Sequence, residues 1–240
     1  MAQADWTILT NVAPTNVIAR GVVYTAVDIT PPNGGGDFVF GFNSISNTPG
    51  SVGLHLSAVA FNPTVSGGSV RGAIRRGTTG ATQSGMSVGL FIGLSGTDVD
   101  DTCYMLGLSD DDPSNLILRK GLLSEGVIAN PPGNPSTLGT LRRSVASYNQ
   151  GEWVHVRLDM VVNGTGDVVL NVFQNNLDDN AVTSPVWEAV SGMDQYVDDA
   201  LGINTGTVPL VLGRTGFCFE SSASARRAFV DAFQATRQVP

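Results

Sequence analysis

Positively charged residues are scarce in this sequence. Only one of the 240 residues is a lysine, Lys120, and Lys and Arg together number 13 against 21 Asp and Glu, which gives a net charge of −8. Nucleic-acid binding depends on clustered lysines and arginines that neutralise phosphates. The sequence therefore predicts no nucleic-acid partner.

Long apolar runs are also missing, and we expect no leader segment. No apolar run reaches the roughly 18 residues of a membrane-spanning helix. The first residues, Met-Ala-Gln-Ala-Asp-Trp, contain neither the basic nor the apolar region of a signal peptide. We expect no membrane contact. We also expect synthesis in a host cytoplasm, so that any role outside the cell depends on release as part of a particle.

Cysteine is also rare, with two residues. Cys103 and Cys218 each stand in an apolar run typical of a strand. Two buried free thiols are the favoured interpretation, because an unpaired cysteine behaves as a small hydrophobic side chain. A disulfide between them is the alternative that the sequence leaves open.

What the chain does contain is material for strands and turns. Hydrophobic residues make up 42%, and 29 glycines and 12 prolines supply many turns. The clearest element is a hairpin from Gly151 to Phe173, in which apolar residues alternate with polar and aromatic ones. Its turn, Asn163-Gly164-Thr165-Gly166, is rich in residues that tolerate a positive φ. One face of the hairpin is suited to a core and the other is half polar.

The rest of the chain predicts an all-β protein with a single main domain. Apolar segments recur between turn signals every 8–14 residues or so, a spacing typical of a sandwich or jelly roll. The loop Pro31 to Gly36 separates an N-terminal arm or first strand, residues 1–36, from one sandwich domain, residues 37–240. We expect one short helix from Met193 to Leu201, ended by Gly202.

Three segments resemble the concanavalin A-like lectin/glucanase superfamily, of the laminin-G type. They are Gly151-Glu152-Trp153-Val154-His155-Val156-Arg157-Leu158, the following Asn163 to Gly166 turn with its return strand, and the pair Gly216-Phe217-Cys218-Phe219 and Ala228-Phe229-Val230-Asp231-Ala232-Phe233. The resemblance covers about residues 37–238 and implies an antiparallel jelly-roll sandwich. With its low lysine content and no expected leader segment, the sequence also resembles structural proteins of tailed bacteriophages.

The glucanases of this superfamily carry acidic residues on one strand, as Glu-x-Asp-x-x-Glu, because a retaining mechanism needs carboxyl groups about 5 Å apart. This chain has only four glutamates, Glu125, Glu152, Glu188 and Glu220, and none lies in such a pattern. We therefore expect no catalytic residues and no enzymatic activity.

Asp110, Asp111 and Asp112 form one of the densest acidic clusters. Clustered carboxylate oxygens suit Ca²⁺, and the resemblance implies that a loop calcium is common in such proteins. Aspartates in a turn can equally be solvated groups that cap the loop backbone. Calcium at these three residues is the one cofactor that the sequence suggests.

Candidates for a carbohydrate site or a protein interface are aromatic and polar residues that strands could present together. They are Trp153, His155, Arg157, Asp159, Trp187 and Tyr196. Aromatic and arginine side chains are enriched at interfaces, and they also form sugar sites. The alternative for Trp153 is a purely structural role, in which its ring packs under a neighbouring strand or loop.

These observations favour a non-enzymatic structural protein of a phage virion, in capsid decoration or at the tail tip. Its expected partners are other virion proteins and further copies of itself, in a symmetric homo-oligomer. The alternative is a carbohydrate-binding lectin module for attachment to a host surface.

Overall fold

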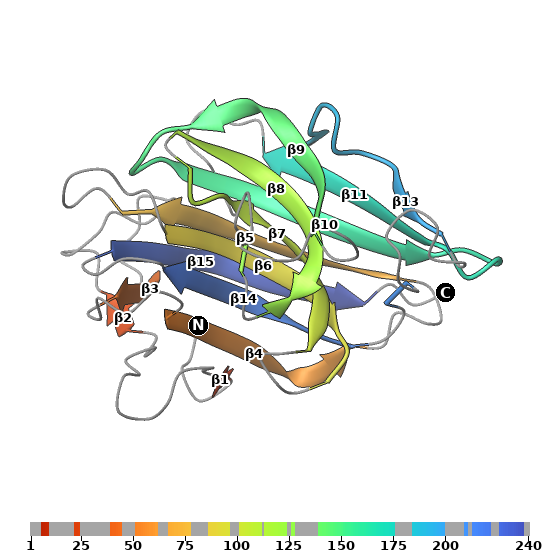
Figure 1. Cartoon of the computed structure of the whole chain (residues 1–240), viewed down its shortest axis with the longest axis horizontal. Coiled ribbons are helices and arrows are strands. Elements are labelled where there is room, and N and C mark those ends of the chain that lie inside the picture. The colour runs from red at the N-terminus through yellow and green to blue at the C-terminus, as the bar shows by residue number, and fades with distance from the viewer. Residues whose placement is uncertain are drawn as a thin grey trace.

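The computed structural model forms an antiparallel β-sandwich (Figure 1). It describes residues 6–9, 22–24, 39–44, 51–61, 67–77, 86–96, 101–111, 113–123, 126–127, 139–175, 184–199, 209–210, 213–221 and 226–237. Within these ranges fifteen strands form two sheets, and the prediction of an all-β jelly-roll sandwich is confirmed. No helix in the described part of the chain is long and apolar enough to cross a membrane.

Sheet A has seven strands. In spatial order they are β1 (Trp6–Leu9), β4 (Ser51–Phe61), β14 (Gly213–Ser221), β6 (Met86–Leu94), β7 (Thr102–Leu108), β8 (Ser114–Leu122) and β9 (Gly139–Tyr148). Sheet B runs β12 (Trp187–Ala189), β11 (Val168–Asn175), β10 (Trp153–Val162), β5 (Gly68–Arg76), β15 (Arg226–Arg237), β3 (Val39–Ser44) and β2 (Val22–Tyr24), and β13 (Tyr196–Asp198) also pairs with β11. The strands β9, β11 and β13 lie along one flank of the sandwich, at the top of Figure 1.

The main core lies between the two sheets. Sheet B supplies the alternate residues Val154, Val156, Leu158 and Met160 of β10, and sheet A supplies Leu90 of β6 among others, all of them inaccessible to solvent or nearly so. A second apolar cluster lies on the outer side of sheet A and includes Cys103 and Cys218. Both cysteines are buried and free, so the favoured interpretation of their state is confirmed.

The predicted hairpin is present as β10 and β11. These strands pair in antiparallel register from Val156 with Gln174 to Val162 with Val168. Within the turn the Asn163 side chain accepts a hydrogen bond from the backbone N–H of Thr165 at 3.0 Å, and Gly166 has a φ of 90°. The residue types of the turn thus select the register of the hairpin, and the register decides which side chains face the core.

The prediction of a helix from Met193 to Leu201 is wrong in the described part of that segment. Residues 196–198 form strand β13, which pairs with β11 through Val197 opposite Val169. Tyr196 and Asp198 are buried whereas Val197 between them is 39% exposed, which is the alternation of a strand. The apolar spacing fits a helix as well, but pairing with β11 and a buried partner for Asp198 decide the outcome.

The N-terminal segment, residues 1–36, contains two described strands. β1 pairs with β4 and β2 pairs with β3, so both belong to the sheets of the same chain. Contact of this segment with a neighbouring molecule, and a boundary at residue 36, stay predictions.

Candidate functional site

The outer surface of sheet B gathers most of the predicted site residues. Because β10 turns its aliphatic side chains to the core, the alternate residues Trp153, His155, Arg157 and Asp159 lie on the opposite face. The register with β11 and β12 brings Trp187 to the same face, through Asn175. We call the following residues the polar face of sheet B: Arg71, Arg75, Trp153, His155, Arg157, Asp159, Phe173, Asn175 and Trp187.

Arg157 is the centre of the polar face. Its guanidinium carbon lies 4.2 Å from the ring centroid of Phe173 and 5.2 Å from that of Trp187. Its Nη2 donates a hydrogen bond to Oδ2 of Asp159 at 2.9 Å. The ring centroids of His155 and Trp187 are 4.7 Å apart. Stacked rings and an ion pair therefore hold the arginine in one place.

Two further arginines come from β5, the strand paired with β10 on its other side. Arg71 lies directly opposite Arg157, and Arg75 lies opposite Trp153, with its guanidinium carbon 5.8 Å from the ring centroid of that tryptophan. Burial lowers the pKa of both β5 arginines, and the charge of Arg157 lowers that of Arg71 further. Burial likewise raises the pKa of Asp159, against the opposing effect of Arg157. The face therefore concentrates positive charge in an acidic protein.

His155 is fully buried and neutral at neutral pH. Its pKa is lowered to about 4, first by burial and then by the charge of Arg71. The side-chain nitrogen of Asn175 lies 3.3 Å from Nδ1 of His155. An amide NH₂ group donates, so Nδ1 accepts and the ring proton lies on Nε2.

Several polar atoms of the face have no hydrogen-bond partner among the described residues. They are Nε of Arg75, Nε2 of His155, Nε of Arg157 and Oδ1 of Asp159, and all four are inaccessible to solvent. Buried polar atoms in proteins are normally paired with protein or ordered water, so a cluster of unpaired ones calls for an explanation. Three of the four are donors, and they lie next to two tryptophans.

Tyr196 does not join the polar face. It lies opposite Leu170 of β11, on the core side of sheet B, and is buried. The guanidinium carbon of Arg142 in β9 stands 4.6 Å from the centroid of its ring. Of the six predicted site residues, the structure therefore brings five together and places Tyr196 on the other side of the sheet.

A groove of about 260 Å³ lies between β9 of sheet A and the strands β11 and β12 of sheet B. Its lining includes Tyr148, Gln174, Glu188 and the strongly exposed Val145. The hydroxyl of Tyr148 donates a hydrogen bond to Oε1 of Gln174 at 2.7 Å, which links the two sheets. Tyr148 is buried. Its burial, and to a smaller extent the negative charge of Glu152, raises the pKa of its hydroxyl group to about 12.

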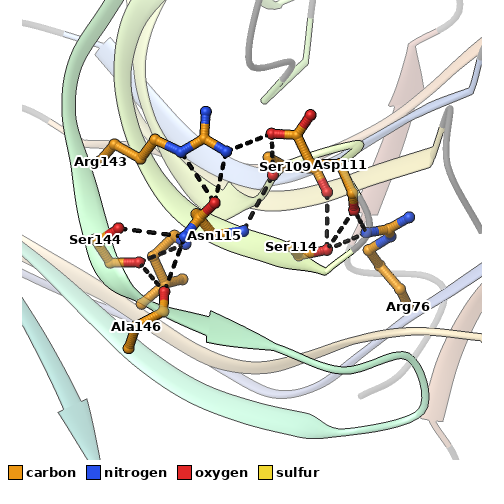
Figure 2. Close-up of polar contacts among 9 residues, drawn as sticks. Arg76, Ser109, Asp111, Ser114, Asn115, Arg143, Ser144 and Ala146 are labelled. Carbon is orange, nitrogen blue, oxygen red and sulfur yellow. Dashed lines mark hydrogen bonds and ion pairs between the residues drawn. The ribbon is translucent and has the colours of Figure 1, made fainter.

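The predicted calcium ligands lie in the turn between β7 and β8, where Figure 2 shows a network of polar contacts. Oδ2 of Asp111 accepts a hydrogen bond from Nη2 of Arg143 at 2.6 Å, and the Asp111 carbonyl accepts one from Arg76 of sheet B. Asp110 is half-buried, and Asp112 lies outside the described residues. Among the described residues no group of three or more His, Cys, Asp or Glu side chains is placed to hold a metal ion.

This network joins the two sheets at one end of the sandwich. Arg76 also donates to the hydroxyl of Ser114, and Asn115 receives hydrogen bonds from Arg143 while its own amide group donates to the carbonyls of Ser144 and Ala146. Arg143 thus contacts the Asp111 carboxylate and Arg76 contacts its carbonyl, and both contacts help to hold the turn.

The predicted site residues did not include the two β5 arginines, and the buried ion pair between Lys120 and Asp198 was not predicted. The arginines alternate with Val70 and Ile74, so the face of β5 was readable, but its pairing with β10 joins segments far apart in the chain. Lys120 was a signal in itself, because a lysine between Leu118 and Leu122 in an apolar strand needs a buried partner.

Comparison with known proteins gives a likeness of fold and nothing closer. No protein-family model matches the sequence, and no curated protein matches it. Solved structures do match along almost the whole chain.

Three of these structures illustrate the likeness. The carbohydrate-binding module CBM66 from Bacillus subtilis is 9% identical, covers 97% of this chain and 95% of its own, and has a TM-score of 0.49. A legume lectin-like domain from Entamoeba histolytica is 10% identical over 98% and 91%, with a TM-score of 0.49. The lectin from Bauhinia forficata, in complex with GalNAc, is 10% identical over 98% and 93%, with a TM-score of 0.47. Likeness at this level transfers no activity to the chain.

Proposed function

We propose that the protein is a non-catalytic carbohydrate-binding module that binds sugar at the polar face of sheet B. The observation that carries the proposal is the gathering of three partly exposed arginines, Arg71, Arg75 and Arg157, beside aromatic rings on one face of sheet B. Sugar hydroxyls accept hydrogen bonds from guanidinium groups, and a sugar ring can pack against an aromatic ring. Trp187, which is half-buried, supplies an apolar ring beside them.

The charge of the face narrows the class of sugar. Among the described side chains of this face, the acidic groups near Arg71, Arg75 and Arg157 are Asp159 of β10 and Asp231 of β15. Arginine binds carboxylates through two parallel hydrogen bonds, and a carboxylate would offset the repulsion between Arg71 and Arg157. The proposed ligand is therefore a glycan that contains an acidic sugar.

The test is binding to a glycan array that contains neutral and acidic sugars, with and without calcium, followed by titration calorimetry on the best ligand. We expect Trp187→Ala to weaken binding about tenfold, the size of one lost stacking contact. Arg143→Ala is the matched control, because Arg143 is an exposed arginine on sheet A, and it should bind as the unaltered protein does. A protein that binds no glycan, or whose Trp187→Ala variant binds equally well, would contradict the proposal. Loss of binding on calcium removal would point instead to the turn that contains Asp110 and Asp111.

A structural role within a particle, such as a phage virion, is the second candidate. It is favoured by Val145, which is 88% exposed on β9, one of the two edge strands of sheet A. Edge strands with exposed apolar residues pair readily with other chains. Sedimentation velocity should then show an oligomer that Val145→Lys dissociates, and a monomer at every concentration would remove the support for this candidate.

A further inference from the structure

Three polar side chains meet inside the core, away from the polar face. Nζ of Lys120 in β8 lies 2.7 Å from Oδ2 of Asp198 in β13, and the hydroxyl of Tyr104 in β7 donates a hydrogen bond to the same oxygen. The Lys120 and Asp198 side chains are 1% and 0% exposed. We call Tyr104, Lys120 and Asp198 the Lys120 cluster.

The surroundings of the cluster make an ion pair an expensive arrangement. Leu118 of the same strand and Leu106 of β7 belong to the buried aliphatic core, as does Leu170 opposite Tyr196. Taking a carboxylate and an ammonium out of water costs several kcal/mol per ion by general experience, and their mutual attraction offsets this only in part. An uncharged group formed from the same two side chains would not carry this cost of desolvation.

We propose that Lys120 and Asp198 condense to form an intramolecular amide that covalently links sheet A to sheet B. The Lys120 ammonium first gives up one proton, and its lone pair attacks Cγ of Asp198. The bond between Nζ and Cγ forms, and the bond between Cγ and Oδ2 breaks. The departing oxygen leaves as water with two protons, and the original ammonium loses two protons in total, one of them by way of Tyr104. No oxidant or second substrate takes part.

Tyr104 is placed to assist the departure of Oδ2. Its hydroxyl donates to that oxygen and itself accepts a hydrogen bond from the backbone N–H of Leu210 at 3.0 Å. Tyr104 can therefore pass its proton to the departing oxygen, and it recovers a proton from Nζ. Burial and the neighbouring Asp198 raise the pKa of Tyr104, so it is protonated in the resting protein.

The fold also holds the reacting groups at a fixed separation. Tyr104 and Lys120 are directly opposite in the β7–β8 register, and Asp198 is fixed opposite Val168 by the pairing of β13 with β11. Such positioning replaces an encounter in solution and can be worth an effective concentration of about 10⁵ M or more. The link would close a loop between residues 78 positions apart.

Mass spectrometry of the purified folded protein tests the proposal. We expect the unaltered chain to be lighter than its sequence mass by one water molecule, and proteolysis to yield a branched peptide that joins Lys120 to Asp198. The Lys120→Arg variant keeps the positive charge but should retain its full sequence mass. A cyclic imide at Asp198 would also lose water, but it would persist in Lys120→Arg and give no branched peptide.

An unaltered chain that keeps its full mass after prolonged incubation in the folded state would overturn the proposal. So would a loss of water without the branched peptide. Tyr104→Phe sharpens the role of the hydroxyl, because it should slow the loss of water at least tenfold. Equal rates in Tyr104→Phe and the unaltered protein would overturn the role assigned to Tyr104. Glycan binding is a separate measurement, since no residue of the Lys120 cluster belongs to the polar face.

Discussion

The Lys120 cluster and the polar face of sheet B both bury charged groups, but only the first satisfies them. In the cluster, the Lys120 ammonium and the Tyr104 hydroxyl both reach Oδ2 of Asp198. On the polar face, four buried polar atoms have no partner among the described residues, including Nε of Arg157 and Oδ1 of Asp159. The paired Lys120 cluster suits a link within the protein, whereas the partly exposed arginines of the polar face suit a ligand from outside.

Breaking the Lys120 cluster should have the largest effect on stability. Asp198→Ala leaves Lys120 charged and buried without its carboxylate, and we expect the free energy of unfolding to fall by about 3–5 kcal/mol. Urea unfolding followed by tryptophan fluorescence would measure this. The double variant Lys120→Met with Asp198→Leu removes both charges and should recover the part of the loss that comes from the unpaired Lys120 charge, but not the part that comes from the proposed link. A small loss in Asp198→Ala would show that water reaches Lys120.

Lowering the pH should reduce the free energy of unfolding through His155, which lies on the polar face of sheet B. Its folded pKa is about 4 and its ordinary value is 6.5, so the unfolded chain takes up the proton first as the pH falls. The stability due to neutral His155 is therefore complete above about pH 6.5 and is lost between pH 6.5 and 4, by up to about 3 kcal/mol.

Urea unfolding at pH 7, 6 and 5 would measure this loss, with His155→Gln as the reference that lacks the titrating group. Other carboxylates contribute to both proteins, so the difference between the two curves isolates His155. A difference that does not change with pH would mean that the ring is protonated in the folded state as easily as in water.

Arg71→Met should stabilise the unliganded protein slightly. Like charges directly opposite each other on paired strands are unfavourable, so removing Arg71 from its position opposite Arg157 should raise the free energy of unfolding by about 0.5 kcal/mol. The pKa of His155 should rise at the same time, which NMR titration can follow. Weaker glycan binding by this more stable variant would indicate that the arginine is kept for function. A loss of stability would show that Arg71 is structural.

The smallest effect is expected at the exposed ion pair between Arg143 and Asp111. Both side chains are well exposed, at 45% and 39%, and such pairs contribute about 0–1 kcal/mol. Arg143→Ala should lower the thermal midpoint by no more than a few degrees. A larger change would show that the network in Figure 2 acts as one unit.

The sequence predicted the local pattern better than the pairing of distant segments. Alternation along β10 and the glycine-rich turn identified the hairpin and its two faces, because both are properties of neighbouring residues. Trp153, His155, Arg157 and Asp159 were correctly placed on one face for the same reason. Their meeting with Trp187 depends on the register of β12 with β11, which no local pattern specifies.

The errors have the same origin. The spacing of Met193, Tyr196 and Val197 fits a helix as well as a short strand, and pairing with β11 decides between them. Tyr196 was grouped with the polar residues, although its strand turns it to the core side. The need of Lys120 for a partner was readable from its apolar neighbours, but the identity of Asp198 was not, because the two residues are 78 positions apart.

The burial of the sole lysine has a practical consequence for work on this protein. Amine-directed reagents find no lysine side chain on the surface of the folded chain, since Lys120 lies between the sheets at 1% exposure. In chains that have not formed the proposed amide, a reagent that modifies Lys120 reports the parting of the two sheets, as amide exchange reports local opening. Chains that have formed the amide should not react at all, so the reagent also counts the unlinked fraction.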